Sequence, residues 1–431
     1  MQRPQLAEFI KHMDQDSVAI ITSAPEATRS NDTQYRFRQN SDLYYLTGFE
    51  EPETIAVIAP KQEKKFMLFV RPRDPEREIW DGRRAGVEGA VRDYGAEEAF
   101  PFSEFSEKLG DLINNARNLY YRIGDGNPLV DEIIIKQIAR MRAQGRKGIM
   151  PPEAIIDPGT IIHEMRLIKS DDEVALMQRA ADIAAEAHVE AMKLARPGMK
   201  EYEIEALIEY IFRKSGATCP AYSSIVGSGA NATILHYINN DAELQDGDLL
   251  LIDAGAEYRG YASDITRTFP VNGRFTKAQR DIYDLVLATQ LDCIKMARPG
   301  VSMDELKSHS IELLTEGMVR LGLLEGDPAK LIEEEKYKQF YMHGLGHFLG
   351  IDVHDVGLYY SDGESRRLEP GMVITVEPGV YIAADTKEIP EKYLGIGVRI
   401  EDDVLITEDG NRVLTNKVPK EPEEIEQLMT R

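Results

Sequence analysis

The chain has 431 residues, a formal net charge of -23, 42% hydrophobic residues and two cysteines. This length predicts two domains, and the negative charge argues against nucleic acid or an anionic membrane as a partner, because phosphate groups would be repelled. Two cysteines are too few for a disulfide framework or a thiolate zinc cluster, and the sequence has neither a signal peptide nor an apolar segment of about 18 residues, so we expect a soluble cytoplasmic protein.

The first 160 residues alternate short apolar runs with polar segments of helical type. The apolar runs cover residues 18–22, 54–59, 65–70, 105–116 and 119–123. This alternation predicts an α/β domain at residues 1–160. The proline-rich segment MPPEAIIDPGT, at 150–160, interrupts both periodicities, so we place the boundary there and expect a second domain at 161–431.

Two similar segments follow in the second domain. Ser170 begins the capping-box sequence SDDE and Thr276 begins TKAQ, and each opens a helix that ends at an ARPG sequence. A further helix follows each ARPG, and then a loop that contains glycine and histidine. The similarity predicts a duplicated α+β unit with a pseudo-twofold axis, whose ligand site would draw side chains from both halves.

The segment LLLIDAGAEYRGYASDITRT, at 249–268, predicts a β-hairpin that carries two carboxylates. Asp253 ends an apolar run and Asp264 lies on the returning segment. Buried carboxylates are costly unless they are paired, hydrogen-bonded or bound to a metal. For Asp253 alone, capping of a turn is an equally good interpretation.

Histidines gather in two of the later loops. The motif MHGLGHFLGIDVHDVG contains His343, His347 and His354, and its glycines favour a loop over a helix. His236 lies in the earlier loop GSGANATILHY. A lone histidine is usually a packed or surface group, but four of the eight histidines fall in these two loops, which favours a site.

Two more carboxylates follow apolar strands near the C-terminus. GMVITVEPGVYI places Glu377 at the end of one run, and GIGVRIEDDVLIT places Arg399 and Glu401 on one face of another. For Glu401 alone, a salt bridge with Arg399 is the favoured alternative.

Taken together, these motifs offer four carboxylates and one imidazole: Asp253, Asp264, His347, Glu377 and Glu401. Two divalent cations would balance the four negative charges. Oxygen-rich ligation favours Mn²⁺, while the imidazole leaves Co²⁺ or Zn²⁺ open. Two ions about 3.5–4 Å apart activate a hydroxide for attack on a carbonyl, which predicts a hydrolase without a serine or cysteine nucleophile.

These motifs resemble those of the pita-bread metallopeptidases. Together with FRQNSDLYYLTGFEEPE, at 37–53, and in the same order, they are similar to bacterial aminopeptidase P, the Xaa-Pro aminopeptidases, over nearly the whole chain. The resemblance implies an α/β N-terminal domain, an α+β pita-bread catalytic domain and two metal ions, usually manganese. It implies that Asp264 and Glu401 bridge the ions, that Asp253 serves one ion, and that His347 and Glu377 serve the other.

The resemblance also implies roles around the metal. Glu377 would be the general base and then the general acid. His236, His343 and His354 would line the substrate site and stabilise the tetrahedral intermediate.

Three more residues receive roles in the same way. Arg399 and Tyr381 would hold the ligand carboxylates, so they would support catalysis without touching the metal. Trp80, the only tryptophan, would contribute to the site of a neighbouring subunit. The resemblance thereby implies a homo-oligomer, either a dimer or a tetramer.

The implied activity is release of the N-terminal residue from peptides with proline in the second position. Prolidase, which uses the same site on Xaa-Pro dipeptides, is the alternative, because the sequence does not reveal what closes the cleft beyond proline. A non-catalytic binding module is a rival from another class. That rival predicts at least one degraded ligand position, and all five positions are intact.

Overall fold

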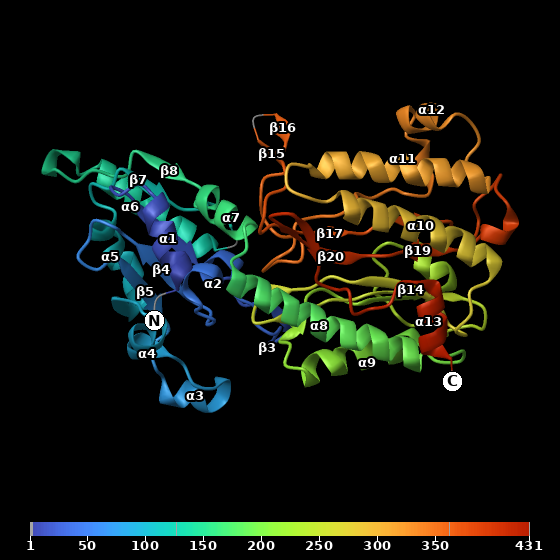
Figure 1. Ribbon diagram of the computed structural model, residues 1–431. Coiled ribbons are helices and arrows are strands. Elements are labelled where there is room, and N and C mark those ends of the chain that lie inside the picture. Colours follow the sequence, from blue (N-terminus) through green and yellow to red (C-terminus); the bar gives the residue numbers. More distant parts are fainter. Residues whose placement is uncertain (1–2, 126, 362, 431) are drawn as a thin grey trace. The chain divides into compact units, whose positions relative to one another are not determined.

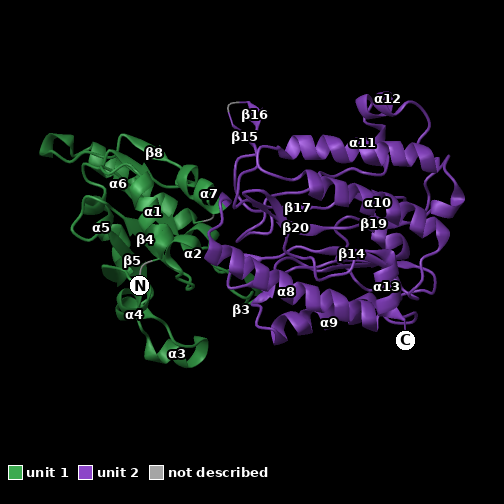
Figure 2. Ribbon diagram, in the orientation of Figure 1, with its two compact units in different colours: residues 1–166 green, residues 167–431 purple. Residues whose placement is uncertain are grey.

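A computed structural model describes residues 3–125, 127–361 and 363–430. The chain divides into two compact units, residues 1–166 and 167–431 (Figure 2). The boundary predicted at residue 160 lies within helix α7 (Gly159–Leu167), close to this division. No helix in the described part of the chain is long and apolar enough to cross a membrane.

Unit 1 is built on a six-stranded mixed sheet with the order β6-β5-β4-β1-β7-β8. β1 pairs antiparallel with β4 and parallel with β7. The apolar runs at 18–22, 54–59, 65–70 and 119–123 contribute to β1, β4, β5 and β7, whereas the run at 105–116 forms helix α5. Phe69, Phe105 and Ile134 belong to one core between this sheet and helices α5 and α6. The strands are β1 (Val18–Thr22), β4 (Ile55–Ile58), β5 (Phe66–Val70), β6 (Glu98–Pro101), β7 (Asn118–Tyr120) and β8 (Ala154–Ile156), with the short hairpin β2 (Thr28–Ser30) and β3 (Thr33–Gln34) outside the sheet.

The α-helices of the described part of this unit form the predicted α/β architecture together with the sheet. α3 has no buried residue, whereas α5 and α6 each turn an apolar face to the core. The helices are α1 (Pro4–His12), α2 (Ser41–Thr47), α3 (Pro75–Asp81), α4 (Gly86–Tyr94), α5 (Phe105–Leu112) and α6 (Pro128–Arg142).

Unit 2 repeats one arrangement twice, as predicted. Helices α8 (Asp171–Leu194) and α10 (Lys277–Met296) both begin with capping boxes, formed by Ser170 with Glu173 and by Thr276 with Gln279. Each is followed by a packed partner helix, α9 (Glu201–Lys214) or α11 (Met303–Leu321). In Figure 1 the two helix pairs lie on opposite sides of the strands of this unit.

Among the strands of unit 2, β10-β11-β14 and β17-β20-β21 form two similar antiparallel sheets. The predicted hairpin at 249–268 is present, since β11 and β14 pair with Asp253 opposite Thr266. The strands of this unit are β9 (Cys219–Pro220), β10 (Ile225–Ser228), β11 (Leu249–Asp253), β12 (Ala256–Tyr258), β13 (Tyr261–Ala262), β14 (Thr266–Pro270), β15 (Tyr360–Ser361), β16 (Glu364–Ser365), β17 (Val373–Val376), β18 (Gly379–Tyr381), β19 (Gly397–Arg399), β20 (Asp402–Thr407) and β21 (Gly410–Val413). Two short helices, α12 (Pro328–Glu333) and α13 (Pro422–Met429), complete unit 2.

Candidate metal centre and substrate pocket

The four candidate carboxylates occupy matching positions in the two halves of unit 2. Asp253 ends β11 and Asp264 precedes β14, while Glu377 directly follows β17 and Glu401 directly precedes β20. The halves meet here, because the backbone N–H of Glu401 donates to the carbonyl of Thr266 at 3.0 Å. The pseudo-twofold arrangement therefore brings two acids from each half to one place.

A pocket of about 500 Å³ opens at this place. All five predicted metal ligands line it, together with Arg399 and the three predicted histidines of the substrate site. The remaining lining residues are Tyr222, Ser223, Ile225, Leu235, Ile238, Gly344, Gly346 and Val353. Trp80 belongs to the other unit, where it lies on α3 with 86% of its surface exposed.

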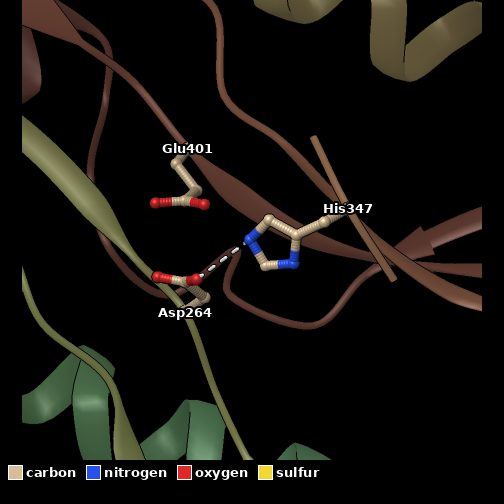
Figure 3. A group of neighbouring side chains, drawn as sticks. All are labelled: Asp264, His347 and Glu401. Carbon is tan, nitrogen blue, oxygen red and sulfur yellow. Dashed lines mark ion pairs between the residues drawn. The ribbon is translucent and has the colours of Figure 1, made fainter. Parts of the chain in front are cut away.

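Asp264, His347 and Glu401 form the tightest group in the pocket (Figure 3). One ligand atom from each of these residues lies within 4.8 Å of the others. The Nε2 atom of His347 lies 3.5 Å from Oδ2 of Asp264 and 3.6 Å from Oε1 of Glu377. Such spacing suits donor atoms that share a cation between them.

Hydrogen bonds fix the direction in which His347 and the glutamates point. His347 Nδ1 lies 3.0 Å from the carbonyl of Phe348, so that nitrogen carries the proton and Nε2 is left as the ligand atom. The hydroxyl of Thr375 donates to Glu377 at 3.3 Å, and the hydroxyl of Thr266 donates to Glu401 at 2.7 Å. These partners orient the donor atoms toward the pocket.

Arg399 forms its ion pair with Asp253, with Nη2 2.6 Å from Oδ2. The alternative salt bridge considered for Arg399 and Glu401 is therefore replaced by a pairing across the two halves. Strand β19 ends at Arg399 and β20 begins after Glu401, so the single strand predicted across this segment is interrupted. The hydroxyl of Thr266 contacts the side chains of both Arg399 and Glu401. It accepts from Arg399 Nε at 3.0 Å and donates to Glu401 at 2.7 Å.

Burial and the charges of neighbouring residues shift the pKa values of several candidate ligands. Burial, followed by the charges of its acidic neighbours, raises the pKa of Glu401 well above its ordinary value. Burial also raises the pKa of Glu377 to about 7, although the charges of His347 and Arg399 oppose the shift. Burial likewise raises the pKa of Asp253, although Arg399 opposes the shift. Burial disfavours a charged His347, but Asp264 and Glu377 outweigh it and raise its pKa to about 9.

This donor set fits divalent cations. Four carboxylates converge on the pocket, and among the described residues that line it Arg399 and His347 are the counter-charges beside them. Two positive groups do not balance four acids, and burial raises the pKa of Asp253, Glu377 and Glu401. Oxygen donors with one imidazole suit Mn²⁺, Co²⁺ or Zn²⁺, and bound cations would relieve the repulsion.

A chain of hydrogen bonds links Arg399 to His343. Arg399 Nη1 donates to the hydroxyl of Tyr381 at 3.0 Å, and that hydroxyl lies 2.8 Å from His343 Nε2. Tyr381 therefore reaches Asp253 only through Arg399. Burial and the neighbouring charge of Arg399 lower the pKa of His343 to about 4, so its ring is neutral near pH 7.

The other two histidines lie at the mouth of the pocket. His354 is exposed and packs edge-to-face against His347, with 4.4 Å between the ring centroids. Burial and His347 together lower the pKa of His354. His236 is also exposed, and it lies in the loop after the short 3₁₀ helix at Gly229–Thr233.

Reasoning from the sequence missed Tyr222, Thr266 and Thr375. The Tyr222 hydroxyl lies 2.5 Å from Asp253 Oδ1 and also contacts Asp264, so one phenol touches two candidate ligands. No motif marked this residue. The two threonines are spaced two residues from Asp264 and Glu377 along their strands, so the rule that alternate strand residues share a face could have found them.

The fold and the acidic pocket define a metallopeptidase of the pita-bread class. Residues 175–408 match the model of metallopeptidase family M24, and residues 3–120 match that of the aminopeptidase P N-terminal domain. The chain is 49% identical over 423 residues to a Xaa-Pro aminopeptidase of Escherichia coli strain K12, covering 98% of this chain and 95% of that protein.

Solved structures agree with this likeness. Pseudomonas aeruginosa aminopeptidase PepP matches with a TM-score of 0.96 and 49% identity, over 99% of this chain and 96% of that chain. Zinc-substituted E. coli aminopeptidase P in complex with product matches with a TM-score of 0.95 and 48% identity, over 99% and 96%. The chain therefore belongs to the aminopeptidase P family of M24 metallopeptidases.

Proposed function

We propose that this protein releases the N-terminal residue from peptides whose second residue is proline, with two divalent metal ions as cofactor. The observation that carries the proposal is the convergence of all five candidate ligands on one pocket. Membership of the aminopeptidase P family and the similarity to a Xaa-Pro aminopeptidase support the substrate class.

The charges in the pocket favour an aminopeptidase over a prolidase. A prolidase must hold the free carboxylate of a dipeptide, which requires a cationic side chain beyond the proline. Among the described residues that line the pocket, Arg399 is the only lysine or arginine, and its guanidinium is committed to Asp253, Tyr381 and Thr266. A tripeptide carries its carboxylate farther from the reacting bond, so it needs no cationic side chain next to the proline.

The metal would be held by Asp253, Asp264, His347, Glu377 and Glu401. When bound, the ions supply Lewis-acid polarisation of the scissile carbonyl and activation of water. Glu377 takes a proton on its carboxylate and returns it to the leaving amine of proline. His354 and His236 donate hydrogen bonds to the substrate carbonyls, and Asp253 lies near the free amine.

Hydrogen bonds made by Arg399, Tyr381 and His343 support this arrangement. Arg399 keeps Asp253 oriented, and Tyr381 keeps the ring of His343 facing the substrate. Because the pKa of His343 is lowered to about 4, the ring stays neutral at neutral pH and does not repel the cations.

The test compares rates on Ala-Pro-Ala and Ala-Pro with metal-loaded enzyme. We expect cleavage of the tripeptide, and a prolidase would instead prefer the dipeptide. Glu377→Ala and His354→Ala should each lower kcat/KM on the tripeptide by about 10²-fold or more. Retention of the parent rate within about tenfold would show that the assigned roles are wrong, and protein that binds no Mn²⁺ by calorimetry would instead indicate a non-catalytic module.

We further propose manganese as the working metal, a dimer or tetramer as the assembly and the cytoplasm as the location. Oxygen-rich ligation supports manganese. The family resemblance supports the oligomer and a role for the exposed Trp80 at a neighbouring site, and a sequence with only two cysteines supports a reducing compartment. Metal analysis of the purified protein, light scattering on a sizing column and cell fractionation test the three proposals.

A further inference from the structure

The loop that carries His236 has little regular structure of its own. It follows strand β10 and consists of one short 3₁₀ helix, Gly229–Thr233, and then irregular backbone up to the segment before β11. His236 is exposed, so packing of the ring does little to fix its position. The position of the imidazole therefore depends on whatever holds the backbone of the loop.

A single buried carboxylate holds this loop. Glu201, the first residue of α9, is 0% exposed. Its two oxygens face five donors, all uncharged and all between residues 228 and 242. They are the backbone N–H of Ser228 at 2.7 Å, the hydroxyl of Ser228 at 2.8 Å, the amide of Asn231 at 3.1 Å, the hydroxyl of Tyr237 at 2.8 Å and the backbone N–H of Ala242 at 2.9 Å.

These donors surround His236 in the sequence. Ser228 and Asn231 precede it, Tyr237 is the next residue and Ala242 follows the loop. A carboxylate accepts at up to about four lone-pair sites and donates nothing, so this set of donors uses its whole capacity. One side chain thereby fixes the beginning, the middle and the end of the loop.

We propose that Glu201 is a positioning residue for His236, and so for the substrate carbonyl that His236 contacts. This inference rests on the proposed peptidase function. Glu201 is not among the described residues that line the pocket, and its carboxylate accepts from the loop, so its effect on catalysis passes through the loop backbone.

The isosteric substitution Glu201→Gln tests this role sharply. It replaces one acceptor oxygen by an NH₂ donor, and in either amide orientation that NH₂ faces a backbone N–H, of Ser228 or of Ala242. A backbone donor cannot turn away as a hydroxyl can, so the loop must move. A misplacement of about 1 Å costs on the order of 10²-fold in rate, and we expect a loss of kcat/KM of that size.

Tyr237→Phe is a milder variant in case Glu201→Gln fails to fold. It removes the hydroxyl of Tyr237, the residue next to His236. That hydroxyl lies 2.8 Å from Glu201 and 3.2 Å from Asp241. We expect kcat/KM to fall by about tenfold, as for the loss of one hydrogen bond to a charged group. Tyr393→Phe is the matched control, because Tyr393 is also buried and also donates to a carboxylate, that of Asp281 at 3.0 Å. That control should keep the parental kcat/KM.

The decisive measurement is a double-mutant cycle on the metal-loaded full chain with Ala-Pro-Ala as substrate. In a His236→Ala background, Glu201→Gln and Tyr237→Phe should lower kcat/KM no further, because the group they position is already absent. Mn²⁺ affinity measured by calorimetry should stay within about threefold of the parent in both variants, since Glu201 does not act through the metal.

The inference is overturned if both substitutions leave kcat/KM unchanged, if their losses are the same with and without His236, or if the Mn²⁺ affinity falls with the activity. A parent enzyme that does not cleave the tripeptide at all would instead refute the proposed function, so the two failures are distinguishable.

Discussion

Lys169 and Asp355 form an ion pair that is buried almost completely. Lys169 Nζ lies 3.0 Å from Asp355 Oδ2, and each side chain is 1% exposed. Lys169 follows α7, whereas Asp355 is the neighbour of His354 in the active-site loop. The pair therefore ties the segment that opens unit 2 to a loop that lines the pocket.

Replacing Lys169 by methionine should strongly destabilise unit 2. At 3.0 Å and an effective dielectric of about 20, the Coulomb attraction of the pair is about 5 kcal/mol. Removing one partner of such a buried ion pair costs about 3–5 kcal/mol. Lys169→Met/Asp355→Asn removes both charges, so the double variant should recover about half of that loss or more.

The assay is the free energy of unfolding from urea titration of metal-free protein, in which metal binding does not add to stability. Lys11→Met is the control, because Lys11 and Glu8 form a pair of similar length, 2.7 Å, that is solvent-exposed. That control should leave the unfolding transition unchanged. The electrostatic reasoning would be refuted if Lys169→Met cost less than about 1 kcal/mol, or if the double variant lost as much as the sum of the single variants.

Three further predictions follow from other parts of the chain. Adding metal at about 100 times its Kd should raise Tm by about 5–10 °C, measured by calorimetry with and without a chelator. Gly255→Ala should cost about 1–3 kcal/mol in unfolding free energy by urea titration and weaken Mn²⁺ binding, because its Cβ would lie 1.7 Å from the carbonyl oxygen of Ser263. Burial tends to raise the pKa of Asp42, but bonds from His163 and Arg166 outweigh it and lower the pKa. As the pH falls, the unfolded chain therefore takes up a proton on Asp42 before the folded chain does. The stability that Asp42 contributes is present above about pH 4 and lost below it. Asp42→Asn should flatten this part of a plot of the urea midpoint against pH.

Local signals in the sequence predicted much of the fold. The capping boxes at Ser170 and Thr276 form as expected, because such a box depends on residues only three positions apart. The strands that lead to Asp253 and Glu377 were visible as apolar runs. The matching ARPG sequences predicted the repeat, since each half buries its helices in the same way.

Contacts between distant residues could not be predicted from such signals. Arg399 lies two residues from Glu401 but pairs with Asp253, because β19 ends at Arg399 and β20 begins only after Glu401. Glu201 reads as an ordinary acid in the first turn of an amphipathic helix, and only the folded loop reveals its five donors. Tyr222 likewise carries no pattern of its own.

On the proposed ligand set, the order of the acids along the chain also determines when metal can bind during synthesis. The ribosome releases Asp253 and Asp264 long before Glu377 and Glu401, so the nascent first repeat carries two closely spaced negative charges without their partners. With the ligand set proposed above, a site built from both repeats cannot form until the second repeat has been synthesised and has docked. On that proposal, metal binding follows translation of residue 401 and stabilises only chains in which both repeats are folded.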